Sequence, residues 1–412
     1  MKDQPAVSVK WEFYSLCLLA ASLPIVEVTK NLAWFMLVIF FAIRNIKTKQ
    51  DLLADFLGNM FLGFMLLSAV AAVGASFNGY DSGKISDIIR YGLVGWMLMY
   101  IPLSKQQIYT ILALLFVATS IGVIVAYLET AYWQGGAFEL RSVGHINHTA
   151  IFIALTLGAI VPLLLSRTSA FQARLVLMPM AIILTAGLFF ADSRAGIVAL
   201  AIIVAIALLH SLMFHLKTGV AVLLLAIAAG GYMVSAPPKV VEELVDRPML
   251  YMGNTPAPRE KLWNSAVYGL KKEPVFGIGF GNYSIIDPEQ LSLWFPDEDF
   301  TDNEQFYYSS HAHNRFLNSA VEGGIFGFAG LMLLLVGPAI CLWRNRKFML
   351  HKSTSAAFWV IPATSMAIVT VIGLVNTTIH HEHGLLTMML FGLSFNFLNR
   401  LQSSQAPAKT VA

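Results

Sequence analysis

The sequence is poor in charged residues and in cysteine. Only 12% of its 412 residues are charged and the formal net charge is +3, whereas soluble domains carry roughly 25% charged residues. This composition excludes an ordinary soluble domain, and the basic residues are too scattered for a nucleic acid partner. The two cysteines, Cys17 and Cys341, lie in apolar runs and provide no disulfide framework.

Convincing cofactor and metal motifs are also missing. Gly277, Gly279 and Gly281 have G-x-G-x-G spacing instead of the dinucleotide G-x-G-x-x-G, which favours a plain tight turn. The run 380–383 (HHEH) has metal-ligand residue types but not H-E-x-x-H spacing, and adjacent histidines on one helix would point in different directions. The acidic run 297–299 (DED) matches a metal-binding D-x-D pattern only in isolation. We therefore predict no metal and no cofactor.

Long apolar runs are what the sequence has in abundance, since 57% of its residues are hydrophobic. A membrane-spanning helix needs about 20 mainly apolar residues. Twelve candidate spans lie near 11–28, 31–46, 53–76, 88–104, 107–128, 148–166, 172–191, 195–214, 218–235, 314–343, 355–374 and 379–399. The sequence predicts an all-α, multi-pass membrane protein with a single integral-membrane domain (1–412). The first run has no small-residue cleavage site, so we expect the N-terminus to be retained.

The basic residues orient these spans, because Lys and Arg in short loops favour the cytoplasm. An internal N-terminus places most basic loops inside and one large loop, 236–312, between the ninth and tenth spans in the periplasm. Seven of the ten histidines then fall at the external face: His145, His148, His311, His313, His380, His381 and His383. We therefore expect any chemistry to face the periplasm.

Charged residues at helix ends near this face are candidates for function. Arg194 begins a helix after Asp192 and offers a planar fork to a phosphate, although pairing with Asp192 or contact with lipid headgroups is the alternative. Arg259 lies in the large loop. His313 precedes Asn314 at the top of the tenth span, where a neutral imidazole could take a proton from a hydroxyl, although a purely structural histidine is the alternative.

The spacing around His313 resembles a known signature. His313-Asn314, nine further residues, Gly324 and Gly327 look like the H-[NSQ]-x9-G-x-x-[GTY] pattern of the bacterial O-antigen ligases. "RSVGHINHTA" (141–150), "SRAG" (193–196) and "PREKLW…EPVFGIGFGNY" (258–283) resemble other segments of the O-antigen ligase and polymerase superfamily. Gly323 and Gly327 also form a G-x-x-x-G pair, from which we expect close approach of another helix.

The resemblance implies a GT-C-type membrane glycosyltransferase of the bacterial inner (cytoplasmic) membrane. Such a ligase moves glycan from undecaprenyl diphosphate to a lipid A–core hydroxyl in the periplasm, without a metal and with inversion at the anomeric carbon. His313 would be the general base and Arg194 and Arg259 would bind the diphosphate. Arg141 is a weaker substrate-binding candidate.

Asn314 and His311 are two further substrate-binding candidates within the signature, and His311 competes with His313 for the role of base. An O-antigen polymerase or a protein O-oligosaccharyltransferase of the same superfamily is an alternative that differs in the acceptor. A secondary transporter is an alternative of another class, but transporters usually carry paired broken helices in two related halves.

Overall fold

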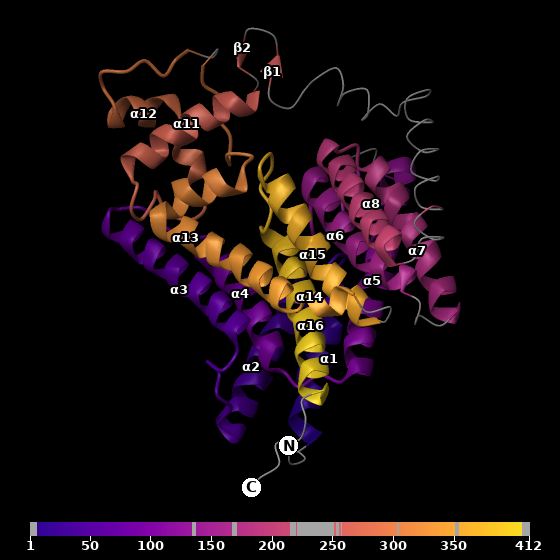
Figure 1. Cartoon of the computed structure of the whole chain (residues 1–412). Helices are drawn as coiled ribbons and strands as arrows, with labels where there is room; N and C mark the ends of the chain where they lie inside the picture. The colour runs from indigo at the N-terminus through magenta and orange to yellow at the C-terminus, as the bar shows by residue number, and fades with distance from the viewer. Residues whose placement is uncertain are drawn as a thin grey trace.

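The computed structural model consists almost entirely of helices packed along one another (Figure 1). It describes residues 6–133, 137–166, 171–214, 220, 251–252, 255–256, 258–302, 305–350 and 354–405. The helices before the large loop are α1 (Ala6–Ser22), α2 (Glu27–Thr48), α3 (Phe56–Phe77), α4 (Ile85–Tyr100), α5 (Lys105–Leu128), α6 (Ile146–Leu165), α7 (Phe171–Phe190) and α8 (Arg194–Phe214). A π-helical turn, η1 (Glu129–Trp133), extends α5.

The later elements are α11 (Pro258–Lys272), the 3-10 turn η2 (Tyr283–Ile285), α12 (Pro288–Trp294), α13 (Arg315–Arg344), α14 (Arg346–Met349), α15 (Thr354–Gly373) and α16 (His381–Gln405). Strands β1 (Tyr251–Met252) and β2 (Thr255–Pro256) form a two-residue antiparallel hairpin. This hairpin is the exception to the predicted all-α fold within the described ranges.

Each predicted span coincides with a helix, apart from 218–235, of which only residue 220 is described. In the described part of the chain, eight helices are long and apolar enough to cross a membrane. They are α2, α3, α5 with η1, α6, α7, α8, α13 and α15. Because α1 and α4 have only 17 and 16 residues, they reach about 25 Å, which is less than the roughly 30 Å hydrocarbon layer. The structure therefore has the helical, membrane-type architecture that the sequence predicts, and the number of twelve crossings stays a prediction.

Helix α16 lies at the centre of the bundle. It packs against α4, α6 and α15, and residues 382–398 are all buried. Asn396 shows how a polar residue is accommodated there, because its Nδ2 donates to the carbonyl oxygens of Leu98 (2.6 Å) and Ile101 (2.8 Å) at the end of α4. The buried position explains why this helix is less apolar than the lipid-facing ones.

Two buried ion pairs connect the N-terminal helices to each other and to the rest of the bundle. Arg44 on α2 donates through Nε to Glu12 on α1 at 2.9 Å, and both side chains are almost completely buried. Lys30 on α2 pairs with Glu382 on α16 and also donates to Ser142 Oγ at 2.9 Å, just before α6. Burying a charge is costly unless it is paired, so these contacts fix the relative positions of α1, α2, α6 and α16.

Helix α13 is broken at Gly324, where the backbone turns to φ 58° and ψ −154°. The glycine turn that follows α11 docks at this break: Ile278 N–H donates to Val321 O and Gly279 N–H donates to Glu322 O, both at 3.0 Å. A Cβ on Gly324 would lie 2.2 Å from the carbonyl oxygen of Val275, so only glycine fits there. The predicted tight turn is confirmed, and at least these two amides are not available to an anion.

The Gly323 and Gly327 pair lies against an aromatic ring of the glycine turn as well as beside helix α3. A Cβ added to Gly323 would lie 2.7 Å from the ring of Phe280, and the nearest atom of α3, Ala71 Cβ, would lie at 3.7 Å. The ring of Phe280 thus packs against both glycines, and α3 comes within van der Waals distance of Gly323, as the spacing predicts.

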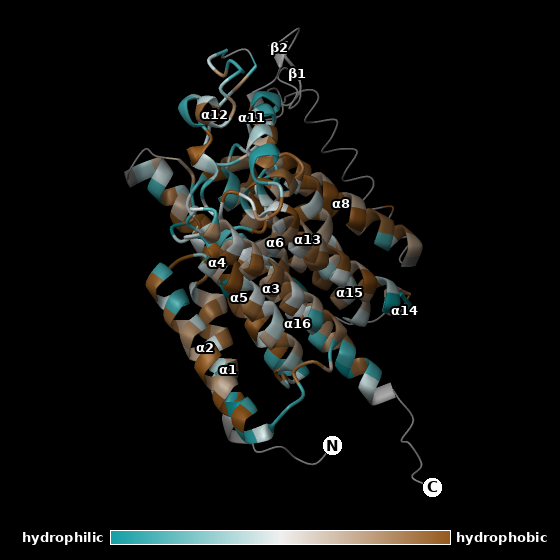
Figure 2. Cartoon of the chain, turned by 90° about the vertical axis from the view of Figure 1, so that its left-hand side faces the viewer, coloured by the Kyte–Doolittle hydropathy of each residue, from teal (hydrophilic) through white to brown (hydrophobic). Residues whose placement is uncertain are grey.

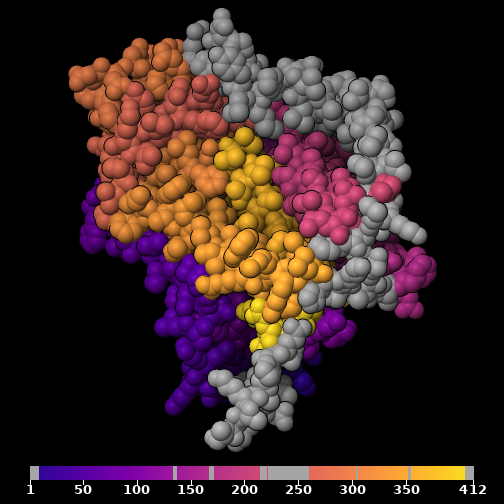
Figure 3. Space-filling view, viewed as in Figure 1, coloured from indigo at the N-terminus to yellow at the C-terminus, as the bar shows by residue number. Residues whose placement is uncertain are grey.

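The segment that carries α11 and α12 forms a second, smaller core at one end of the bundle. Ala266, Tyr283, Leu291, Phe300 and Phe306 pack together there, apart from the main core of the helices. Figure 1 shows this end opposite the start of α1 and the end of α16. Figure 2 shows it richer in hydrophilic colour than the brown helical middle, and Figure 3 shows its surface over the start of α13.

Candidate active site

The segment that leads into α13 is held by three side chains. Asn314 caps the helix, because its Oδ1 accepts from the backbone N–H groups of Phe316 and Leu317 at 3.0 Å. The Trp263 indole of α11 donates to Ala312 O at 3.1 Å. Asn318 Oδ1 accepts from Ala312 N–H, also at 3.1 Å. The side-chain oxygen of Asn314 is thus occupied, so the contact with substrate predicted for it would have to use its NH2 group.

His313 sits in the left-handed backbone region, with φ 47°, immediately before this cap. Burial lowers the pKa of its imidazole, the nearby charge of Arg259 lowers it further, and the side chain of Asn376 partly opposes the shift. Its Nδ1 is buried and has no hydrogen-bond partner among the described residues. The ring is therefore neutral at pH 7, which is the form that can accept a proton.

Arg194 and Arg259 come together from distant parts of the chain. Arg194 begins α8, and the preceding Ser193 Oγ donates to Asn147 Oδ1 at 2.8 Å, which joins the "SRAG" segment to the start of α6. Arg259 lies in the first turn of α11, and its pKa is lowered by burial and then by the charge of Arg194. The charge of Arg259 also lowers the pKa of His313. These two guanidinium groups and the neutral imidazole form one cluster, which we call the Arg–His cluster (Arg194, Arg259 and His313).

Like charges close together in a half-buried place are unfavourable unless an anion lies between them. No described carboxylate forms an ion pair with Arg259 within 4.0 Å. The Arg–His cluster is thus suited to bind an anion such as a diphosphate.

A cavity of about 360 Å³ lies beside the Arg–His cluster, between α4, α6, the glycine turn and the starts of α13 and α16. Residues that line it include His145, His148, His311, Arg315, His380 and His381. The three residues of the cluster do not line it. The ring centroid of His311 lies 4.1 Å from that of His313, so His311 adjoins both the cavity and the cluster. Burial and the neighbouring His313 lower the pKa of His311 to about 4.

The prediction that seven histidines gather at one face is confirmed. Ring centroids lie 5.7 Å apart for His145 and His148 and 5.0 Å apart for His148 and His383. Those of His380 and His381 lie 3.7 Å apart. His311 is close enough to His145 and His381 for their charges to lower its pKa. This proximity joins His311 and His313 to the histidines at the starts of α6 and α16.

Arg141 lies outside this arrangement. Its guanidinium is 59% exposed and donates through Nε to Glu129 Oε1 at 2.7 Å, and this hydrogen bond raises the pKa of Arg141. Glu129 begins the π-helical turn η1, so the pair is formed at the end of α5. The structure therefore does not bring Arg141 to the Arg–His cluster, and a role in substrate binding stays a prediction.

Two site residues escaped the sequence reasoning. Asn376 contacts His313, and Lys84 lines the cavity. Arg315, one of the arginines that the sequence places at the level of the histidines, also lines the cavity and is 6% exposed. The only signal for Asn376 was its place in a polar stretch, "NTTIHHEH" (376–383), between two apolar runs. Nothing local in the sequence places Lys84 near His311.

A comparison with protein families bears on the resemblance that the sequence shows. Residues 179–332 match the model of the O-antigen ligase family. The resemblance to the O-antigen ligases is confirmed. The O-antigen ligase match contains all of the Arg–His cluster and the break at Gly324, and it excludes Arg141 and the 380–383 histidines. No curated protein matches the chain.

Proposed function

We propose that the protein is an O-antigen ligase of the bacterial inner membrane. It takes glycan from undecaprenyl diphosphate and joins it to a hydroxyl of the lipid A–core in the periplasm. The proximity of Arg259 to both Arg194 and His313 carries this proposal, and the match to the O-antigen ligase family supports it. The wider fold in this proposal is a GT-C-type bundle of twelve crossings in a single domain (1–412).

In this mechanism His313 takes the proton from the acceptor hydroxyl as its oxygen attacks the anomeric carbon of the first donor sugar. The new glycosidic bond forms while the bond between that carbon and the diphosphate oxygen breaks. Undecaprenyl diphosphate leaves with the electron pair, and Arg194 and Arg259 stabilise its charge. A single displacement without an enzyme nucleophile inverts the anomeric configuration, and the fixed cations do the work of a divalent metal.

The position of His313 suggests how the two substrates are arranged. The imidazole is close to Arg259 and to His311, and His311 lines the cavity. The donor diphosphate would bind at the Arg–His cluster and the acceptor sugar would approach from the cavity. His311 and the NH2 group of Asn314 would then contact substrate without taking the proton.

The loop 236–312 faces the periplasm in this proposal, because the basic loops lie at the opposite end of the bundle. Single cysteines at described, exposed loop positions such as Leu293 and Tyr307, in a chain that lacks Cys17 and Cys341, should react with an impermeant maleimide in intact spheroplasts. A cysteine in place of exposed Trp343, at the other end of α13, should react only after lysis. The reverse pattern would overturn the orientation.

Reconstitution tests the reaction itself. Purified protein, undecaprenyl-diphosphate glycan and lipid A–core should give a conjugate of lower mobility on a gel. A polymerase would instead lengthen the lipid-linked glycan without lipid A–core, and a protein O-oligosaccharyltransferase would need a polypeptide acceptor. Either of those products, with no lipid A–core conjugate, would replace the ligase assignment by one of these superfamily alternatives.

A further inference from the structure

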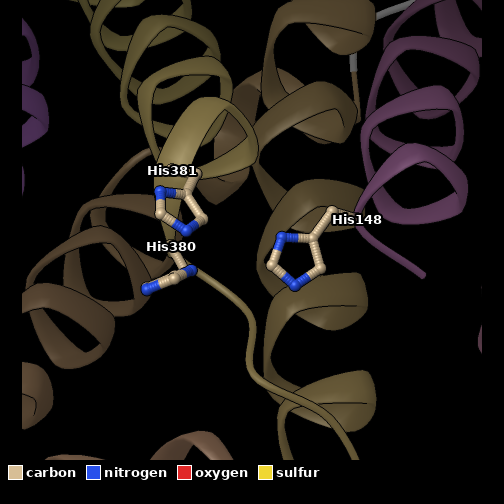
Figure 4. Close-up of side chains that lie close together, drawn as sticks. All are labelled: His148, His380 and His381. Atoms are coloured by element: carbon tan, nitrogen blue, oxygen red, sulfur yellow. The ribbon is translucent and has the colours of Figure 1, made fainter. Parts of the chain in front are cut away.

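Three histidine side chains on the wall of the cavity are arranged as metal ligands. His148, on the first turn of α6, faces His380 and His381, at the start of α16 (Figure 4). One ring nitrogen from each lies within 4.8 Å of the other two. We propose that these residues bind one divalent transition-metal ion, with Zn²⁺ as the representative ion, at a site that is separate from the Arg–His cluster.

The backbone at the start of α16 makes this arrangement possible. The sequence argument against a metal site assumed that His380 and His381 follow each other on a helix. The structure shows that this premise is wrong, because Ile379 and His381 adopt left-handed φ values of 52° and 44° and His380 precedes the helix. The turn brings both rings toward the same side, with their centroids 3.7 Å apart.

The spacing of the nitrogens is close to what zinc needs. In a tetrahedral site with Zn–N bonds of about 2.1 Å, two ligand nitrogens lie roughly 3.4 Å apart. The most distant pair of ring nitrogens is at most 4.8 Å apart, so these two atoms would have to approach each other by no more than about 1.4 Å. Small rotations of two side chains supply this movement. Three protein ligands leave the fourth position open toward the cavity, as in sites that also hold water.

A carboxylate lies behind one of the ligands. Asp87 Oδ2 is 3.8 Å from His381 Nδ1, and Asp87 also lines the cavity. Histidine ligands usually donate their other N–H to such a carboxylate, which fixes the ring and directs the remaining nitrogen to the metal. His381 is one-third exposed, so an ion can reach this ligand from the cavity.

Buried contacts hold the two halves of the site in place. Lys30 pairs with Glu382, which follows His381 in the sequence, and donates to Ser142 Oγ in the segment that leads into α6. His383 is completely buried, and its Nδ1 accepts from the backbone N–H of His380 at 3.3 Å. The turn that carries His380 and His381 and the helix that carries His148 are thus fixed relative to each other, which lowers the cost of binding an ion.

Zinc binding to the purified full chain tests this inference. After removal of the affinity tag and treatment with chelator, the protein is equilibrated with ZnCl₂, desalted and analysed for bound zinc. We expect about one Zn²⁺ per chain, a higher thermal midpoint with zinc, and loss of both effects in His148→Ala and His381→Ala. His311→Ala is the matched control, because it removes another imidazole from the same cavity and should still bind.

Asp87→Asn provides a second measurement that does not remove a ligand. It should leave the stoichiometry at one ion and weaken zinc affinity about 10- to 100-fold in calorimetry. A folded wild-type chain that retains no zinc, or equal retention by the wild type, His148→Ala and His381→Ala, would overturn the inference. The readout is binding alone, so its failure is distinguishable from failure of glycan transfer.

Discussion

Breaking the buried ion pair between Lys30 and Glu382 should strongly destabilise the bundle. The Lys30 side chain is 1% exposed and that of Glu382 is 8% exposed, so neither charge can turn to water. Lys30→Met keeps the length of the side chain but leaves the carboxylate buried without its partner. Removing one member of a buried pair costs about 3–5 kcal/mol, and we expect a loss of that size in the free energy of unfolding.

The double variant Lys30→Met/Glu382→Gln separates the pair from the packing around it. Replacing both members of a buried pair is often nearly neutral, because no isolated charge remains. The double variant should therefore recover most of the stability that the single variant loses. Lys105→Met is the control, because Lys105 is exposed at the start of α5 and its loss should cost within about 0.5 kcal/mol.

The assay is reversible unfolding in mixed micelles, in which SDS is titrated and helix content is followed by circular dichroism. Equal destabilisation of the single and double variants would show that the ion pair itself does not matter. A Lys30→Met variant as stable as the wild type would refute the claim that this contact holds α2, α6 and α16 together.

Four further predictions concern the glycine break and the reaction. Gly324→Ala should cost about 2–4 kcal/mol of unfolding free energy, since it adds a strained φ and a clash with Val275. Gly83→Ala is the control and should be nearly neutral, because the nearest neighbour of its added Cβ is 3.6 Å away. Equal losses of stability in the two variants would show that the break at Gly324 tolerates a side chain. Arg259→Ala should weaken donor binding as well as turnover, because the diphosphate is present in ground and transition states. Isothermal titration calorimetry with undecaprenyl diphosphate measures this affinity, and an affinity equal to that of the wild type would contradict the prediction. Transfer should be unaffected by EDTA, and activity that is restored to the EDTA-treated protein only by Mg²⁺ would contradict the mechanism. The rate of transfer should fall only below about pH 6.5, since the lowered pKa of His313 keeps the ring neutral above that value. A fall in rate centred well above pH 7 would contradict the role of His313.

Helix positions were predictable from the sequence because the length of an apolar run is set by the thickness of the membrane. The grouping of the histidines followed from the same reasoning, since alternating loops assign each polar break to a side. His145 and His381 could be placed at one face in this way although 236 positions separate their numbers in the sequence. Neither step needs knowledge of side-chain contacts.

Contacts between distant segments could not be predicted. The break in α13 depends on the carbonyl of Val275 approaching Gly324, and a helix propensity for one segment contains no information about that approach. The adjacent rings of His380 and His381 depend on the left-handed φ values of Ile379 and His381, and a β-branched residue such as isoleucine rarely has such a φ. Arg141 was assigned to the site by its motif, but Glu129 at the end of α5 is the partner that the fold provides.

The most direct test of the central claim is glycan transfer by His313→Ala beside His311→Ala. A general base contributes typically 10²–10⁴-fold, so the His313 variant should lose transfer by about that factor while it still folds and binds undecaprenyl diphosphate. His311→Ala should lose much less, and the anomeric configuration of the wild-type product should be inverted relative to the donor. Full activity of the His313 variant, or a product of retained configuration, would contradict the account.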